Sequence, residues 1–143
     1  MPASERTGIA FVCVQNAGRS QMAFAFAARE RARRGLAAEI EILTGGTQPA
    51  DSVHPGVVDA MAEVGIDIAD RTPRAVGVDA LQQTDYVITM GCSAREVCPA
   101  GWGGESRDWA LDDPDGEPPA TVARIRDEVE RRVGELFDEL ERR

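Results

Sequence analysis

Lysine is absent from this chain of 143 residues, and all 16 of its basic residues are arginine. The 25 acidic residues outnumber them and leave a formal net charge of -9. Proteins that bind nucleic acid or an anionic membrane surface need an excess of basic charge, so this balance argues against both kinds of partner. Any anionic substrate has to be held by local groups against the overall field of the protein.

Two origins of this composition stay open. An acidic, lysine-free and aromatic-poor chain is expected in a cytoplasm with high salt, where screening over about 3 Å at 1 M tolerates self-repulsion. A GC-rich genome that replaces lysine codons with arginine codons produces the same pattern. Only the halophilic origin predicts stability that rises with KCl.

Long apolar runs are also missing. No segment approaches the roughly 18 to 20 apolar residues that span a bilayer. The N-terminal sequence MPASERTG lacks the basic start and apolar stretch of a secretion signal. We therefore expect a cytoplasmic protein, and its length suits a single domain over residues 1–143.

Cysteine is sparse, with one residue each at positions 13, 92 and 98. An odd, small set does not suit the disulfide framework of a secreted domain. In a reducing compartment such thiols serve metal, redox or nucleophilic chemistry, although free cysteine also packs as a small core residue. Zinc binding by Cys92 and Cys98 needs two further ligands, and none is close in sequence, so we predict no metal site and no bound cofactor.

Predicted strands and helices alternate along the chain. Apolar patterns predict strands at 8–14, 39–43 and 85–90, and helical spacing predicts helices at 20–34, 57–64 and 120–143, with one helical turn near 78–83. Residues 91–119 are rich in glycine and proline and are predicted to form one long loop. This order indicates an α/β fold with a parallel sheet and helices on both of its faces.

Ligands of such folds bind beyond the carboxyl ends of the strands. Those ends deliver Cys13, the loop 44–47 and Cys92. The two cysteine regions are therefore predicted to open on the same edge of the sheet.

The stretch FVCVQNAGRS joins the first predicted strand to the first helix. Between Cys13 and Arg19 lie Val14, Gln15, Asn16, Ala17 and Gly18, enough for a tight loop whose N–H groups point inward. Such a nest at a helix N-terminus binds anions, and the planar fork of Arg19 can grip two oxygens of a tetrahedral oxyanion.

Cys13 at the base of this cradle is the candidate nucleophile. The loop amides, the helix dipole and the Arg19 guanidinium all favour the thiolate form. Ser20 can donate a further hydrogen bond to the sulfur. Asn16 can bond back to the backbone and hold the loop in the required conformation.

The departing oxygen of a substrate also needs a proton donor. The candidates are Asp112 and Asp113 in WALDDPDG, where Pro114 stiffens the chain, although Asp-Asp-Pro also suits a turn or a helix cap. We predict Asp113, the residue beside the proline. The lone histidine, His54, is given no proton-transfer role.

The stretch VCVQNAGRSQMA resembles the signature loop of the low-molecular-weight tyrosine phosphatase fold, and more narrowly that of the arsenate reductases built on it. The resemblance continues through GTQPADSVHP, VGIDIADRTPR, DYVITMGCSAREVCP and DWALDDPDG to IRDEV near the end of the chain. It implies a three-layer α/β sandwich around a four-stranded parallel sheet. Phosphatases of this fold typically have proline after the Arg-Ser pair and aromatic residues after Asp-Pro, whereas this chain has Gln21, Asp115 and Gly116. Reductases carry a cysteine pair, which Cys92 and Cys98 match.

The resemblance implies reduction of arsenate to arsenite, a detoxification reaction. Arsenate sits in the loop from Cys13 to Arg19, and the Cys13 thiolate attacks arsenic while Asp113 protonates the departing oxygen. Cys92 then attacks Cys13 and releases arsenite, and Cys98 resolves the bond into a Cys92 to Cys98 disulfide. An external thiol reductant such as thioredoxin returns the electrons.

The electron donor and the reaction class both have alternatives. Five residues lie between the paired cysteines, one fewer than in the thioredoxin-coupled form, and NAGRSQ also resembles reductases that use a low-molecular-weight thiol. The alternative function is a tyrosine phosphatase that hydrolyses phosphotyrosine or small phosphomonoesters through a cysteinyl-phosphate, which needs only Cys13, Arg19 and Asp113. A non-enzymatic oxyanion sensor has no use for an activated cysteine.

Overall fold

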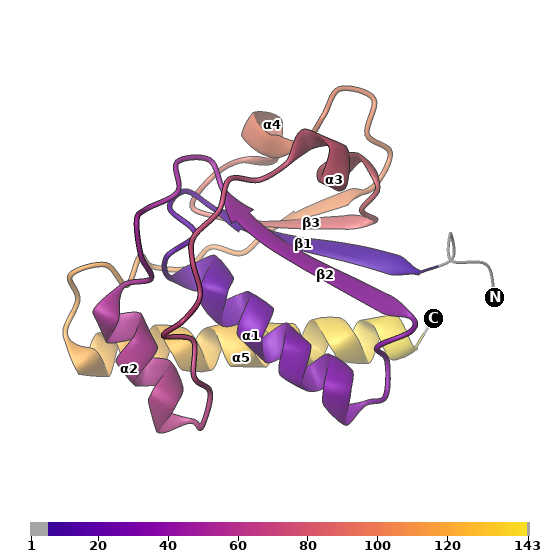
Figure 1. The fold of residues 1–143 in the computed structure, drawn as a ribbon. Helices are drawn as coiled ribbons and strands as arrows, with labels where there is room; N and C mark the ends of the chain where they lie inside the picture. The colour runs from indigo at the N-terminus through magenta and orange to yellow at the C-terminus, as the bar shows by residue number, and fades with distance from the viewer. Residues whose placement is uncertain (1–5, 143) are drawn as a thin grey trace.

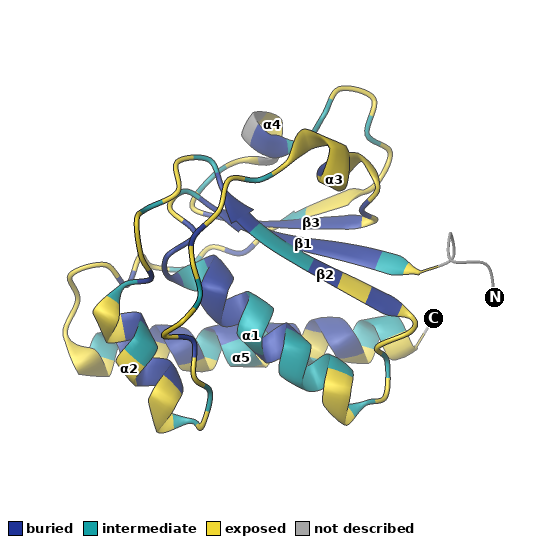
Figure 2. Cartoon of the chain, viewed as in Figure 1, coloured by how far each residue is buried: buried dark blue, intermediate teal, exposed yellow. Residues whose placement is uncertain are grey.

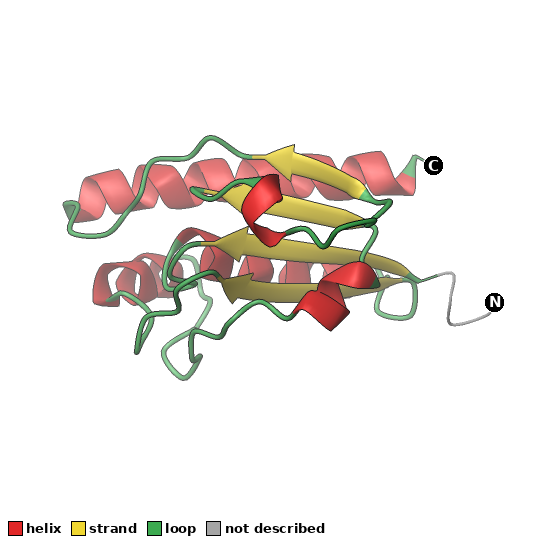
Figure 3. Cartoon of the chain, turned by 90° about the horizontal axis from the view of Figure 1, so that it is seen from above, coloured by secondary structure: helices red, strands yellow, loops and turns green. Residues whose placement is uncertain are grey.

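Four parallel strands form a single sheet in the order β2-β1-β3-β4. The computed structural model describes residues 6–142, apart from the side chains at positions 94 and 96. The strands are β1 (Thr7–Cys13), β2 (Ile40–Gly46), β3 (Tyr86–Met90) and β4 (Glu105–Asp108). Figure 3 shows them side by side, with helices in front of and behind the sheet. The predicted four-stranded parallel sheet is confirmed.

Helices cover the two faces of the sheet unequally, which makes three layers (Figure 1). One face carries three helices: α1 (Arg19–Arg33), α2 (Pro55–Glu63) and α5 (Pro119–Glu141). The other carries only α3 (Val78–Gln82) and α4 (Ala94–Val97), of five and four residues. The second face is therefore the thinly covered one.

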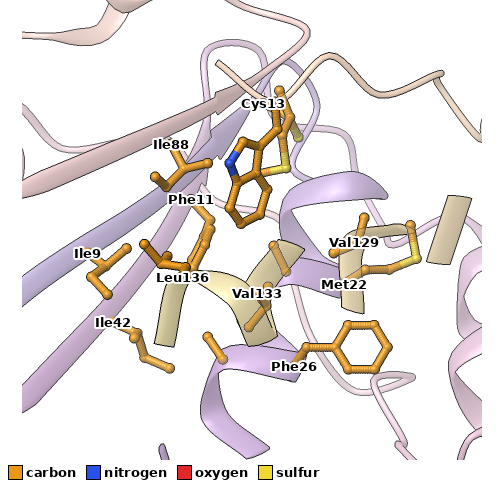
Figure 4. Packing of buried hydrophobic residues seen from close by; sticks show 14 of the residues in the cluster. Ile9, Phe11, Cys13, Met22, Phe26, Ile42, Ile88, Val129, Val133 and Leu136 are labelled. Carbon is orange, nitrogen blue, oxygen red and sulfur yellow. The ribbon is translucent and has the colours of Figure 1, made fainter. Parts of the chain in front are cut away.

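The central strand β1 is buried over six of its seven residues, which explains its continuous apolar sequence. Because side chains alternate along a strand, Ile9, Phe11 and Cys13 join the large core beneath α1 and α5. Ala10 and Val12 join a smaller cluster beneath α3 and α4. In Figure 4, Cys13 lies at one end of the larger core.

The C-terminal helix α5 has the apolar stripe that its sequence pattern predicts. Its buried residues are Val122, Ile125, Arg126, Val129, Val133, Leu136 and Phe137. Figure 2 shows buried residues along the part of α5 that lies behind α1. No helix within residues 6–142 is both long and apolar enough to cross a membrane.

The prediction of one long loop over residues 91–119 was wrong, because α4 and β4 lie within it. The sequence of β4, ESRD, is polar and mostly exposed, since β4 is an edge strand with no apolar face to bury. Arg107 lies with its guanidinium 5.4 Å from the centre of the Tyr86 ring, and it forms ion pairs with Glu105 and Glu139. Hydrophobic periodicity therefore gives no signal for this strand.

Candidate active site

The carboxyl ends of β1 and β3 lie side by side, because Cys13 pairs in register with Met90. The loop after β1 leads directly into α1 at Arg19, and the segment after β3 begins at Gly91. The prediction that both cysteine regions open on one edge of the sheet is confirmed.

A cavity of about 240 Å³ opens at this edge. Its lining residues are Cys13, Val14, Gln15, Ala17, Gly18, Arg19, His54, Gly91 and Asp113. Cys13 is only 3% exposed and forms the base of the cavity. The structure thus brings together all three residues predicted for attack, oxyanion binding and proton donation.

The Cys13 sulfur is held by two hydrogen-bonding groups. The backbone N–H of Asn16 donates to Sγ over 3.2 Å, and Ser20 Oγ lies 2.8 Å from Sγ. Because Ser20 Oγ already accepts a hydrogen bond from Asn16 Nδ2 at 2.7 Å, its own hydrogen is free to point at the sulfur. Both contacts fix the position of the sulfur at the base of the cavity.

Asn16 is fully buried and has a φ of 51°, in the left-handed region. We predicted that its side chain bonds back to the backbone of the loop, but among the described residues it bonds instead to Ser20 and Gln21 at the start of α1 and to more distant segments. Nδ2 donates to Thr44 Oγ1 at 2.9 Å, and Oδ1 accepts from the backbone N–H of Arg74 at 3.1 Å. Asparagine tolerates left-handed backbone better than most residues, and these bonds fix it there.

Carbonyl groups of the loop are bound from outside the cavity. Val14, Gln15 and Ala17 accept hydrogen bonds from the backbone N–H groups of Gln48, Ala50 and His54 at 2.8 to 2.9 Å. Within the described residues, the N–H groups of Gln15, Ala17 and Gly18 make no hydrogen bond. This arrangement leaves donors for a bound oxyanion, as an anion nest requires.

Arg19 is fixed by groups far away in the sequence. Nη1 donates to the carbonyl oxygen of Leu111 at 3.0 Å, and Nη2 lies 3.9 Å from Asp113 Oδ2. Gly91 has a φ of 86°, and a Cβ there would come within 2.6 Å of Arg19 Nη2. Glycine at position 91 therefore makes room for the guanidinium beside the cavity.

The two aspartates of the Asp-Asp-Pro stretch have different surroundings. Asp113 lines the cavity, and its Oδ1 also accepts a hydrogen bond from the backbone N–H of Asp115 at 3.0 Å. Asp112 is exposed and lies 3.4 Å from Arg124, away from the cavity lining. Asp113 therefore takes part in the local turn as well as facing the candidate nucleophile.

Sequence reasoning missed the contribution of His54 and Gly91 to the cavity. The His54 backbone N–H holds the loop at Ala17, and its Nδ1 lies 3.7 Å from Asp115 Oδ1. Both residues reach the cavity from loops that follow other strands. No spacing pattern links them to Cys13, so the sequence offered no signal for this role.

Cys92 and Cys98 share an edge with Cys13 but not a face of the sheet. Both pack at the margin of the smaller cluster with Ala10 and Val12, whereas Cys13 belongs to the larger core on the opposite face. Cys92 Sγ donates to the Val12 carbonyl over 3.7 Å. None of the three cysteines forms a disulfide, and burial raises the pKa of Cys98 above its ordinary value.

No metal centre is formed by the residues that the structure describes. Within 6–142 no group of three or more histidine, cysteine, aspartate or glutamate residues is arranged to hold a metal ion.

Two solved structures are similar in both sequence and fold. A thioredoxin-dependent arsenate reductase from Corynebacterium glutamicum is 34% identical with a TM-score of 0.78, and the match covers 98% of this chain and 64% of that longer chain. A structure titled an arsenate reductase in the phosphate binding state is 32% identical with a TM-score of 0.75, covering 93% and 98%.

Sequence comparisons agree with the structural ones. A Halobacterium salinarum protein, named provisionally as an arsenate reductase, is 56% identical over 139 residues, which cover 97% of this chain and 96% of the relative. The family model described as low molecular weight phosphotyrosine protein phosphatase matches residues 8–143. The chain therefore belongs to the low molecular weight phosphotyrosine protein phosphatase family, in the branch that includes the arsenate reductases.

Proposed function

We propose that the chain is an arsenate reductase in which Cys13 attacks a bound oxyanion and Cys92 and Cys98 carry the redox relay. One observation carries this proposal beyond the family: Cys92 directly follows Gly91, which lines the oxyanion cavity. A phosphatase has no use for a second thiol at that point. The named arsenate reductases among the relatives support the same reaction.

In the first step, arsenate occupies the loop and the fork of Arg19. The Cys13 thiolate forms a sulfur–arsenic bond as one arsenic–oxygen bond breaks. Asp113 gives its proton to the departing arsenate hydroxyl, which leaves as water. The hydrogen bonds of Asn16 and Ser20 to the sulfur hold Cys13 in place for this attack.

In the second step, the Cys92 thiolate attacks Cys13 Sγ and forms a disulfide. The electron pair of the broken sulfur–arsenic bond stays on arsenic, which leaves as arsenite. Cys98 then attacks Cys92, which frees Cys13 and leaves a Cys92 to Cys98 disulfide. An external thiol reductant returns the two electrons and regenerates both thiols.

Cys92 has to change position for the second step, because in this structure it packs on the opposite face of the sheet from Cys13. Glycine at position 91 and the four-residue helix α4 give this segment few constraints. The path is short, because the two strand ends are adjacent in register.

The proposed reaction needs an external electron donor, for which there are two candidates. Thioredoxin is the first candidate, since one similar structure is named a thioredoxin-dependent arsenate reductase. A low-molecular-weight thiol is the second, and a cytoplasmic location supplies either of them.

Phosphomonoester hydrolysis is the second candidate function. The cavity contains Cys13, Arg19 and Asp113, which suffice for a cysteinyl-phosphate intermediate. A related arsenate reductase is described in a phosphate binding state, which favours phosphate as a competing ligand of this loop.

The deciding experiment supplies arsenate together with thioredoxin and its reductase, or with a low-molecular-weight thiol, and measures arsenite. We expect arsenite formation with at least one donor and its loss in Cys13→Ser. Robust aryl phosphate hydrolysis without arsenite under any donor would overturn the reductase function in favour of the phosphatase.

A further inference from the structure

We propose that Arg71 is a positioning residue for Cys13 and acts on it through Gln21 and Asn16. The inference rests on the proposed function only in taking Cys13 as the nucleophile. Arg71 does not line the oxyanion cavity and lies 58 positions after Cys13 in the chain (71 minus 13). Its connection to the sulfur is a continuous set of side-chain hydrogen bonds.

The first link joins Arg71 to helix α1. Its Nε donates to Gln21 Oε1 at 2.7 Å, and its guanidinium carbon lies 4.2 Å from the centre of the Phe24 ring. Gln21 and Phe24 are three residues apart and share one side of the helix. A guanidinium can stack on a ring while its Nε–H donates in plane, which a lysine ammonium cannot do.

The second link runs from Gln21 to Asn16. Gln21 is fully buried, and its Nε2 donates to both the backbone oxygen and Oδ1 of Asn16, each at 3.1 Å. A cation donating to the amide oxygen polarises the amide and strengthens its N–H groups as donors. Arg71 thereby strengthens the hydrogen bonds that Gln21 donates to both acceptors of Asn16.

The third link is from Asn16 to the nucleophile. The left-handed backbone of Asn16 aims its N–H at Cys13 Sγ, and its Nδ2 orients Ser20, the other group bonded to the sulfur. Both hydrogen bonds that stabilise the thiolate therefore depend on the placement of Asn16. Loosening Asn16 weakens both of them together.

The charge of Arg71 is unusual in its surroundings. Among the side chains that the structure describes, it forms no ion pair with a carboxylate, although the chain has a net charge of -9. Burial, with a smaller contribution from the nearby Arg74, lowers the pKa of Arg71. Arg71 is thus a partly desolvated cation that donates to the buried amide of Gln21 and has no neutralising carboxylate among the described side chains. These surroundings fit a role in holding that amide.

The test measures how Cys13 reactivity depends on pH. In the Cys92→Ser, Cys98→Ser background, Cys13 is the only thiol, and its alkylation by iodoacetamide is followed from pH 5 to 9. The charged or titratable groups that share its cavity, namely Arg19 of α1, His54 before α2 and Asp113 after β4, are unchanged in every variant. Arg33→Ala, an exposed site on α1, is the control for loss of one positive charge.

We expect Arg71→Ala to react about tenfold more slowly at neutral pH, with the midpoint of the profile raised by about one pH unit. Gln21→Glu keeps a partner for Arg71 but removes the donor to Asn16, and we expect the same change. Millimolar guanidinium ion should restore Arg71→Ala but not Gln21→Glu. A merely structural role of Arg71 predicts no such rescue, and circular dichroism checks that each variant is folded.

The proposal is overturned if the profile of Arg71→Ala coincides with that of Arg33→Ala, or if guanidinium fails to restore it. If Arg71→Ala does not fold, Gln21→Glu with an unchanged profile overturns it equally. None of these readouts requires arsenate. Failure of the parent protein to reduce arsenate would therefore refute the proposed function and leave this inference intact.

Discussion

The loop that carries Cys13 and the segment that carries Cys92 and Cys98 meet at one edge of the sheet, yet they differ in local structure. Asn16, Ser20 and Gln21 in and after the loop are fully buried and bonded to one another. After β3, only the four-residue α4 interrupts the irregular chain before β4. A site that binds a tetrahedral anion needs preorganised donors, whereas a thiol relay needs a sulfur that moves.

Cys92→Ser is expected to have the largest effect, and it tests whether the loop of Cys13 and the segment of Cys92 have separate roles. We expect arsenate reduction to be lost completely, because the thiol that attacks Cys13 and releases arsenite in the proposed relay is removed. Aryl phosphate hydrolysis should be almost unchanged, because it uses only the loop and Asp113. Arsenite assays and p-nitrophenyl phosphate turnover on the same preparation measure both. Equal loss of the two activities would mean that Cys92 belongs to the oxyanion site itself.

Asp113→Asn tests the proton donor, which serves either chemistry. We expect phosphate ester turnover to fall by about 10² to 10⁴, the usual contribution of general acid catalysis. Asp112→Asn is the matched control, since Asp112 is exposed and lies outside the cavity lining. Similar losses in both variants would assign the effect to the turn before Pro114 rather than to proton donation.

Gly91→Ala tests the point where the two regions touch. Its Cβ would collide with the Arg19 guanidinium, which would have to shift, so we expect oxyanion affinity to fall by about tenfold, or about 1.4 kcal/mol. Gly101 also has a positive φ, but a Cβ there meets nothing within 4 Å. Gly101→Ala therefore shares the backbone strain without the collision. The inhibition constant of inorganic phosphate separates the two variants, and equal constants would contradict the proposed contact.

The smallest expected effect concerns the pH dependence of Cys98, which separates the relay segment from the loop of Cys13. Burial favours the neutral thiol and raises its pKa above the ordinary value of 9.0, so the thiolate fraction at neutral pH is lowered. In the Cys13→Ser, Cys92→Ser background, we expect alkylation of Cys98 to keep rising above pH 9 and to run several-fold slower at pH 8 than that of a cysteine peptide. A rate equal to that of the peptide would contradict the burial of this thiol.

Much of the fold could be predicted because the sequence pattern of each core element indicates which of its residues are buried. The apolar run of β1 and the stripe of α5 both follow periods that depend only on neighbouring residues. Strand β4 could not be found in this way. Its polar side chains are satisfied by ion pairs with residues such as Glu139 of α5, which is distant in the sequence.

The candidate site also has one part that the local sequence predicts and one part that depends on distant contacts. Cys13, Arg19 and the loop between them are contiguous, so strand-loop-helix chemistry alone brings them together. The groups that hold the loop come from elsewhere: Thr44 from β2, His54 from the loop before α2, and Arg71 from the loop after it. Their roles depend on which loops the sheet order places side by side.

By itself, the sequence determined that a thiol lies at the end of a buried strand, with a tight loop and an arginine after it. Local backbone geometry is sufficient for that. The tertiary structure decided how the sulfur is held and on which face each cysteine lies. Strand alternation ends at Met90, so the position of Cys92 depends on the positive φ of Gly91 and on packing against the cluster beneath α4. Such contacts join residues that are far apart in the chain, and no local pattern encodes them.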